Sequence, residues 1–319
     1  MEKVLVIGGL GFVGYHIVNE LQSRKYVVNI GSRSAKEDEY SNASIVHFDL
    51  KGMTDEELES VLYDFDHVIF AGGADDRTIP KGNAQAFFYN ENVVPCVRLI
   101  KLCNSKGVKK MIILGSYFSH FNREKPEWKM AEHHVYVKSR KLQQEESETN
   151  SDGSTAVITL ELPYIFGATP GRTPLWKPLV KYVKSMPVLF YTSGGTNMVS
   201  VESVAQATVG AIENAKHKDR WIVGGDNVSW KDMLGMFSRS LGKKRIVISV
   251  PTFLVRFFSS LVSFFFKVSG KQTGLNLYHF ISTQSANTYL DTEDSMKELK
   301  YSKSDIQKAI DDTVRSCGY

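Results

Sequence analysis

The feature that most constrains this chain is a glycine-rich turn near its start, in the segment VLVIGGLGFVG. Gly8, Gly11 and Gly14 recur at three-residue spacing, between a short apolar run and a segment with helical periodicity. Only glycine allows so tight a turn and so close an approach of the backbone to a ligand. The free N–H groups at the start of the following helix favour a phosphate. The turn, which includes Phe12 and Val13, therefore predicts a dinucleotide-binding site.

Short β-rich runs alternate with longer helical patterns through the first half of the chain. Strands are expected at residues 3–8, 27–30, 44–48, 67–71, 110–115 and 156–161, and helices near 12–24, 54–64, 83–104 and 134–149. Strands that are nearly all apolar, each followed by a helix, indicate a parallel sheet covered on both faces. Because such crossovers are right-handed, the predicted fold class is α/β with a doubly wound parallel sheet.

The alternation of strand and helix patterns stops after residue 167, where the segment GATPGRTPLWKP is rich in proline and glycine. A strand–helix–strand pattern is predicted again at residues 197–225. We therefore expect residues 1–167 and 197–225 to form the dinucleotide-binding domain, and residues 168–196 and 226–287 to form a smaller, discontinuous substrate lobe. Residues 288–319 are expected to form two short helices that pack back on the rest.

Charge and cysteine content exclude several classes of protein. The net charge of +4 arises from 39 basic and 35 acidic residues, so no nucleic-acid partner is expected. Three cysteines lack metal-type spacing and fit a reduced cytosol, and the start of the chain is read as a strand rather than a signal peptide. We expect a cytoplasmic protein without a bound metal, acting on a small-molecule substrate. A homodimer is left open.

The segment FLVRFFSSLVSFFFKV, residues 253–268, is the one stretch that invites a membrane interpretation. It has 16 residues and contains Arg256 and Lys267, so it is too short and too charged to span a bilayer. Its polar residues recur every three or four positions and leave a broad aromatic face. Two interpretations stay open: a lid over an apolar site, which we favour, and peripheral contact with a membrane surface.

The end of the second expected strand bears on the choice of dinucleotide. An acidic residue there would hold the adenosine ribose and repel a 2′-phosphate. The segment VVNIGSRS has no acidic residue, and none follows until Glu37. Arg33 can bind a phosphate bidentately, and the hydroxyls of Ser32 and Ser34 can donate to it. NADP is therefore favoured over NAD.

Several short motifs in order resemble a known family. The spacing G-x-x-G-x-x-G, followed by ILGSYFS, YVKSR and LPYIFG, is similar to the extended short-chain dehydrogenase/reductase family of the NAD-dependent epimerase/dehydratase type. The segment RWIVGGDNVSWKDMLGMFSRSLGKK looks most like the branch with dihydroflavonol-reductase-like and 3β-hydroxysteroid-dehydrogenase-like members. The resemblance covers nearly the whole chain and implies a Rossmann fold.

The resemblance implies roles for residues that contact the dinucleotide. Asp49 would accept a hydrogen bond from the adenine amino group, and Leu50 would pack on the adenine ring. Ala71 and Gly72 would line the dinucleotide with little side-chain bulk. Asn92 matches an asparagine that the family carries on a helix, and its expected role is architectural.

The resemblance also implies a catalytic pair of hydroxyls. Ser116 would hydrogen-bond the substrate carbonyl, and Tyr136 would give that oxygen a proton as hydride arrives. A tyrosine ordinarily keeps its proton at neutral pH, so a cation one helical turn later is needed to favour the phenolate. The family places lysine there, whereas this chain has Arg140, which also offers donors for the nicotinamide ribose. Pro163 and Ile165 would flank the nicotinamide.

Three functions stay open at this point. The first is an NADP-dependent oxidoreductase that reduces a carbonyl on a hydrophobic or conjugated substrate. The second is a nucleotide-sugar epimerase or dehydratase, for which Arg172, Lys177 and Lys181 are candidates to bind the diphosphate. The third is a non-catalytic dinucleotide-binding sensor or assembly protein, because Arg140 replaces a lysine and Glu161 stands where arginine is common.

Overall fold

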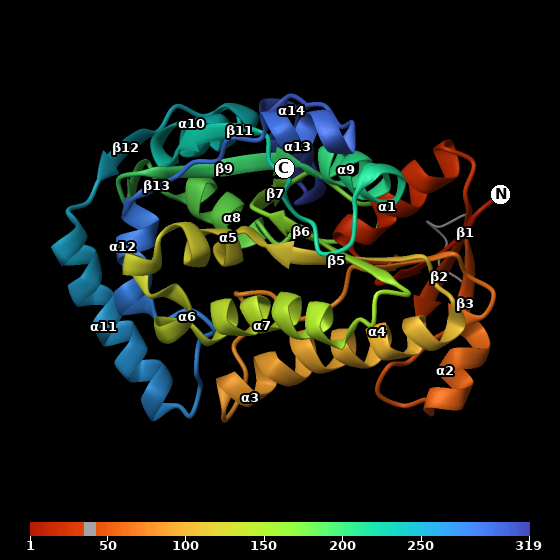
Figure 1. Cartoon of the computed structure of the whole chain (residues 1–319). Helices are drawn as coiled ribbons and strands as arrows, with labels where there is room; N and C mark the ends of the chain where they lie inside the picture. Colours follow the sequence, from red (N-terminus) through yellow and green to blue (C-terminus); the bar gives the residue numbers. More distant parts are fainter. Residues whose placement is uncertain (35–42) are drawn as a thin grey trace.

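The computed structural model describes residues 1–34 and 43–319, and Glu37 lies outside these described residues. A parallel seven-stranded sheet runs through its centre (Figure 1). In spatial order its strands are β10 (Arg220–Ile222), β6 (Ala156–Leu162), β5 (Lys110–Ser116), β4 (His67–Phe70), β1 (Lys3–Ile7), β2 (Val27–Ser32) and β3 (Ser44–His47). The strand order reverses between β1 and β4, which is the switch point of a doubly wound sheet. The predicted fold class is confirmed.

Alternation along β1 explains why its sequence is apolar throughout. Val4 and Val6 belong to the core beneath α1 and α9, whereas Leu5 and Ile7 belong to the core on the opposite face. Both faces are therefore buried, as expected for a parallel sheet. Figure 1 shows α1 (Phe12–Ser23) and α9 (Val201–Asn214) on one side, and α2 (Asp55–Leu62), α4 (Val94–Lys106) and α7 (Val135–Asn150) on the other.

Smaller elements join these helices to the sheet. The helix expected near 83–104 is α3 (Ala84–Phe88), a π-helical turn (Tyr89–Val93) and α4 in succession. The connection from β5 to α7 contains α5 (Tyr117–Glu124), a 3₁₀ turn (Pro126–Trp128) and α6 (Met130–His133).

Two small sheets lie outside the main one. The first has β9 (Gly195–Ser200) at its centre, paired with β7 (Tyr164–Phe166), β11 (Asp226–Ser229) and β13 (Asn287–Thr288). The second is the parallel pair β8 (Val188–Tyr191) and β12 (Ile246–Ser249). Their helices are α8 (Lys177–Ser185), α10 (Trp230–Ser240), α11 (Thr252–Val268) and α12 (Leu277–Ser285).

The end of the chain forms the two helices expected there. The helix α13 (Glu293–Leu299) contacts α9, and α14 (Ile306–Ser316) contacts α10. The range 197–225 contributes to two sheets, because β10 joins the main sheet whereas β9 pairs with strands of the smaller one. The division into two domains at the expected boundaries stays a prediction.

The helix α11 lies along the outer edge of the molecule beside α12, at the left of Figure 1. Its aromatic side chains are largely exposed, Phe253 to 70% and Phe265 to 69%. None of its described residues lines either of the two cavities described below. In this arrangement α11 covers neither of these cavities, and the favoured expectation of a lid over an apolar site stays a prediction. No helix within the described ranges has the length and apolarity needed to cross a membrane.

Candidate active site

The glycine turn between β1 and α1 leaves no room for side chains. Gly8 has a φ of +85°, and a Cβ there would lie 2.8 Å from the carbonyl oxygen of Ala71. A Cβ on Gly14 would lie 2.1 Å from the carbonyl oxygen of Gly8. Gly11 precedes the first residue of α1, and no described side chain caps that end of the helix. The free N–H groups of the first turn are therefore available to an anionic ligand.

Two cavities meet at this turn and share Gly72 and Gly73 in their walls. The first, of about 540 Å³, extends from the start of α1 to the ends of β5 and β6. Of the residues expected at a site, it is lined by Gly11, Phe12, Val13, Gly14, Ala71, Gly72, Ser116, Tyr136, Arg140, Pro163 and Ile165.

The second cavity, of about 520 Å³, lies at the ends of β2 and β3. Among the expected residues, its walls contain Gly8, Ser32, Arg33, Asp49, Leu50 and Gly72. Ser34 lines neither cavity, and its backbone N–H donates to Ser32 Oγ at 3.4 Å. The structure thus brings the residues expected for catalysis and for dinucleotide contact, except Ser34, to the walls of two adjoining cavities.

Tyr136 lies in the first turn of α7, buried with its ring edge against Phe88. Arg140, one turn later and also buried, donates from Nε to Tyr136 Oη at 3.3 Å. The guanidinium is held in place by bonds from Nη1 to Gln143 Oε1 at 2.9 Å and from Nη2 to the carbonyl of Ala74 at 3.4 Å. Because Arg140 has only donors, the hydroxyl proton of Tyr136 needs a different acceptor, and the cavity is where one can bind.

Ser116 is the last residue of β5 and caps the N-terminus of α5. Its Oγ accepts from the backbone N–H of Phe118 at 3.3 Å, which leaves its own hydroxyl proton for another partner. Ser116 and Tyr136 line the same cavity from a strand end and from a helix. The arrangement presents two hydroxyl donors to a ligand oxygen.

Asn92 connects the cavity wall to the helix that carries Tyr136. It lies buried in the π-helical turn before α4, and its Oδ1 accepts from the backbone N–H of Ala74 at 2.8 Å. Its Nδ2 donates to Ser139 Oγ at 3.1 Å, and that hydroxyl donates to the carbonyl of Tyr136 at 2.7 Å. These contacts fit the architectural role expected for it.

Glu161, the unusual acidic residue on β6, is fully buried and paired. Its two carboxylate oxygens accept from Arg123 Nη1 and Nη2 of α5, each at 2.7 Å. Gln144 of α7 donates to the same carboxylate at 2.7 Å. A bidentate pair of this kind satisfies the buried charge and ties together the elements that carry Ser116 and Tyr136.

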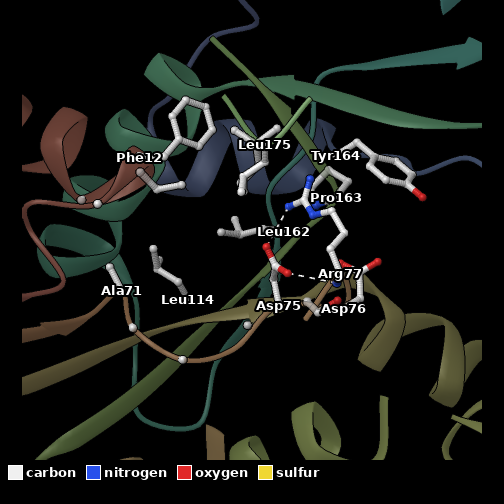
Figure 2. Close-up of a pocket in the computed structure, with 18 of the residues that line it drawn as sticks. Phe12, Ala71, Asp75, Asp76, Arg77, Leu114, Leu162, Pro163, Tyr164 and Leu175 are labelled. Carbon is white, nitrogen blue, oxygen red and sulfur yellow. Dashed lines mark hydrogen bonds and ion pairs between the residues drawn. The ribbon is translucent and has the colours of Figure 1, made fainter. Parts of the chain in front are cut away.

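Sequence reasoning missed three charged residues that follow β4. Asp75, Asp76 and Arg77 line the first cavity (Figure 2). Asp75 Oδ2 pairs with Arg77 Nη2 at 3.0 Å, and the Arg77 guanidinium lies 5.5 Å from the ring centre of Trp176. Burial raises the pKa of the Asp76 carboxyl, although the charge of Arg77 opposes the shift. The signal was their position at the carboxyl end of a parallel strand, where ligands bind in such sheets.

The remaining wall of the first cavity is largely apolar. Leu114, Leu162, Tyr164 and Leu175 surround it in Figure 2. Of the three cations considered for a diphosphate, Arg172 lines this cavity, whereas Lys177 and Lys181 line neither described cavity.

Comparison with known proteins places these features in context. The model of the NAD dependent epimerase/dehydratase family matches residues 4–224. Sterol-4-alpha-carboxylate 3-dehydrogenase (decarboxylating) of Mus musculus is 25% identical over 226 residues, which are 68% of this chain and 60% of that protein. The Homo sapiens enzyme is 24% identical over 229 residues, 69% of this chain and 59% of that protein. The chain thus spans about 60% of the length of the curated relatives that it matches.

Solved structures share the fold at low identity. That of gox2253 has a TM-score of 0.80 at 18% identity, covering 99% of this chain and 98% of the other. UDP-N-acetylglucosamine 4-epimerase from Bacillus cereus has a TM-score of 0.72 at 14% identity, covering 99% and 96%. MoeE5 in complex with UDP-glucuronic acid and NAD has a TM-score of 0.68 at 14% identity, covering 98% of each chain.

Proposed function

The chain belongs to the NAD dependent epimerase/dehydratase family, and from this premise we propose that it uses NADP to transfer hydride to or from a carbonyl of an apolar small molecule. Membership makes the chain a dinucleotide-dependent enzyme, which sets aside the non-catalytic alternative. The observation that carries the proposal is the hydrogen bond from Arg140 to the hydroxyl of Tyr136, on the wall of a cavity that Ser116 also lines.

The residues around the glycine turn fit a dinucleotide. The backbone of Gly8 and Gly14 forms a cradle that a Cβ would fill, and the uncapped start of α1 suits a diphosphate. Beyond it, Asp49 and Leu50 would hold the adenine, and Pro163 and Ile165 would flank the nicotinamide. When bound, the dinucleotide supplies or accepts the hydride.

The second cavity supports NADP as the dinucleotide. Arg33 is exposed on its wall next to Ser32, at the end of β2. A guanidinium there binds a 2′-phosphate bidentately, and the Ser32 and Ser34 hydroxyls add donors. No acidic residue lies among the described residues of this strand end to repel the phosphate.

The two hydroxyls act on the substrate oxygen. In reduction, Ser116 Oγ and Tyr136 Oη donate hydrogen bonds to the carbonyl oxygen and polarise it. As hydride adds to the carbonyl carbon, the π electrons move to oxygen, which takes the proton of Tyr136 and becomes an alcohol. The phenolate left on Tyr136 keeps the bond donated by Arg140 and regains a proton from solvent. Oxidation runs the same steps in reverse.

The first cavity also favours one kind of substrate. Its apolar wall suits a hydrophobic body, and Arg172, together with Arg77 beside its partner Asp75, suits an acidic group. The relatives named as sterol-4-alpha-carboxylate dehydrogenases act on substrates that combine these two features. The same arginines keep nucleotide-sugar epimerisation as the second candidate, because a diphosphate would also bind to them.

Replacement of Tyr136 by phenylalanine tests the proposal. Tyr136→Phe should lower turnover by about 10²- to 10⁴-fold, the usual contribution of a positioned proton donor, with dinucleotide affinity unchanged. Tyr89→Phe is the matched control, because it removes a hydroxyl bonded to Glu146 outside both cavities. The substrate is first found by following NADPH consumption over carbonyl compounds with apolar bodies. Undiminished turnover in Tyr136→Phe would contradict the assignment.

Gel filtration separates the two candidate functions. A reductase exchanges its dinucleotide at every turnover, so the purified protein should lose NADPH on the column. Retention of a stoichiometric dinucleotide, with no net NADPH consumption on any carbonyl tested, would favour the epimerase.

A further inference from the structure

The helix α11 turns its polar side toward the protein. Thr252 Oγ1 donates to Ser285 Oγ of α12 at 3.4 Å, and the guanidinium of Arg256 hydrogen-bonds to Ser282 of α12. Arg256 also lies over the ring of Tyr278, 5.5 Å from its centre. In an ordinary surface helix the apolar side faces the core, so the orientation of α11 is inverted.

The opposite side of α11 is an exposed apolar surface, which we call the aromatic face. It consists of Phe253, Leu254, Phe257, Phe258, Leu261, Val262, Phe264, Phe265 and Val268. Its five phenylalanines are each at least 60% exposed. Ile246 and Ile248 of β12, a few residues earlier in the chain, are exposed as well. So large an exposed apolar surface normally marks an interaction site.

Charge distinguishes the candidate partners of this face. Residues 233–290 contain seven basic and no acidic residues, whereas the whole chain carries +4, so the remainder carries −3. Lys243 and Lys244 are exposed before β12, and Lys271 is exposed after α11. A second copy docked face to face would bring two such basic segments together and repel. An anionic surface is the complementary partner.

We propose that α11 docks the protein on an anionic phospholipid bilayer, lying in the plane of the interface with the aromatic face buried among the lipids. A helix of 17 residues with aromatic residues on its outer side, preceded and followed by segments with exposed lysines, has the composition of an interfacial helix. The basic residues add attraction to the negative surface potential.

The segment that follows α11 is hydrogen-bonded to the start of α7, which carries Tyr136. The carbonyl of Gly274 accepts from the backbone N–H of Tyr136 at 2.9 Å, and the N–H of Asn276 donates to His134 Nδ1 at 3.0 Å. Docking would therefore position the catalytic helix relative to the bilayer. If the proposed function holds, the bilayer is also a source of apolar substrate, but docking itself does not depend on turnover.

Sedimentation of the full chain with vesicles tests the proposal without an activity assay. The wild-type protein should pellet with vesicles of phosphatidylcholine and phosphatidylglycerol. The bound fraction should fall at least about tenfold in Phe257→Ser/Phe258→Ser/Phe265→Ser, because binding scales with buried apolar area. Tyr63→Ser is the matched control, since Tyr63 is 78% exposed just after the C-terminal end of α2, away from α11 (Figure 1). All variants should melt at the wild-type temperature.

Charge is tested separately. Lys243→Glu/Lys244→Glu should lower the bound fraction several-fold, as should raised salt or vesicles of phosphatidylcholine alone. Wild-type protein that stays in the supernatant, or a triple variant that pellets like wild type, would overturn the proposal. Equal binding to neutral and anionic vesicles would also overturn it. So would the finding that the wild-type protein is a dimer in solution and the triple variant a monomer.

Discussion

The helices α7 and α11 both turn polar side chains toward the protein, but their outer sides differ. On α7 the buried residues include Tyr136, Ser139 and Arg140, which hydrogen-bond to one another and to neighbouring elements. Its outer side carries charged residues such as Lys141 and Glu145, which pair at 3.7 Å. On α11 the outer side is aromatic and exposed. A polar inner side therefore accompanies the candidate active site in one helix and the proposed docking surface in the other.

The difference shows what periodicity can establish. A repeat of three or four residues identifies the side chains that share one face of a helix. It does not specify which face meets the protein, because that depends on partners far away in the sequence. For α11 the partners are Ser282 and Ser285 of α12, which accept the polar side and leave the aromatic face outside.

The largest expected effect comes from replacing Arg140 on the inner side of α7, with Arg256 on the inner side of α11 as the comparison. Arg140→Ala should lower turnover by about 10²-fold or more and weaken dinucleotide binding, because it removes the donor to the hydroxyl of Tyr136, the proposed proton donor, and a proposed ribose ligand. Arg140→Lys should keep or raise turnover. Arg256→Ala is the control on α11 and should leave turnover of a water-soluble substrate unchanged. Equal losses in Arg140→Ala and Arg256→Ala, measured by steady-state kinetics, would erase the distinction between the helices.

A smaller effect is expected at the rim of the second cavity. Arg33→Asp should weaken the binding of NADPH by about 30-fold, roughly 2 kcal/mol, because it removes a charged donor and adds repulsion of the 2′-phosphate. NADH has no 2′-phosphate, so its affinity should change less than about threefold. Titration of nicotinamide fluorescence measures both. If the two dinucleotides weaken equally, Arg33 is an ordinary surface arginine.

The smallest effect concerns His134, which precedes α7 and accepts a hydrogen bond from Asn276 in the segment that follows α11. Burial, with some help from His133 and His279, lowers the pKa of His134 to about 4. The unfolded chain binds this proton near pH 6.5, so stability falls as pH drops from about 6.5 toward 4. When the pH falls from 7 to 5, the free energy of unfolding should fall by about 1–2 kcal/mol less in His134→Asn than in the wild-type protein. Urea unfolding at the two pH values measures this difference.

Local sequence was enough for the main sheet and for most of the candidate site. The glycine turn, Ser116 at a strand end and the pair Tyr136–Arg140 each depend on neighbours within one or two elements, so their placement at the cavities followed. What was missed depends on distant partners. Arg123 and Glu161 are 38 residues apart, and the Arg77 guanidinium lies over the ring of Trp176, which is 99 residues later in the chain. The roles of the site residues and the domain boundaries stay predictions.

Hydrogen–deuterium exchange of the wild-type protein tests the central claim, that α7 belongs to a dinucleotide site and α11 to a membrane surface. NADPH should slow exchange in peptides covering residues 8–14 and 135–150, with little change at 252–268. Vesicles containing phosphatidylglycerol should slow exchange at 252–268 and leave 8–14 unchanged. Protection of 252–268 by NADPH alone, with none from vesicles, would contradict the account and return α11 to the role of a lid.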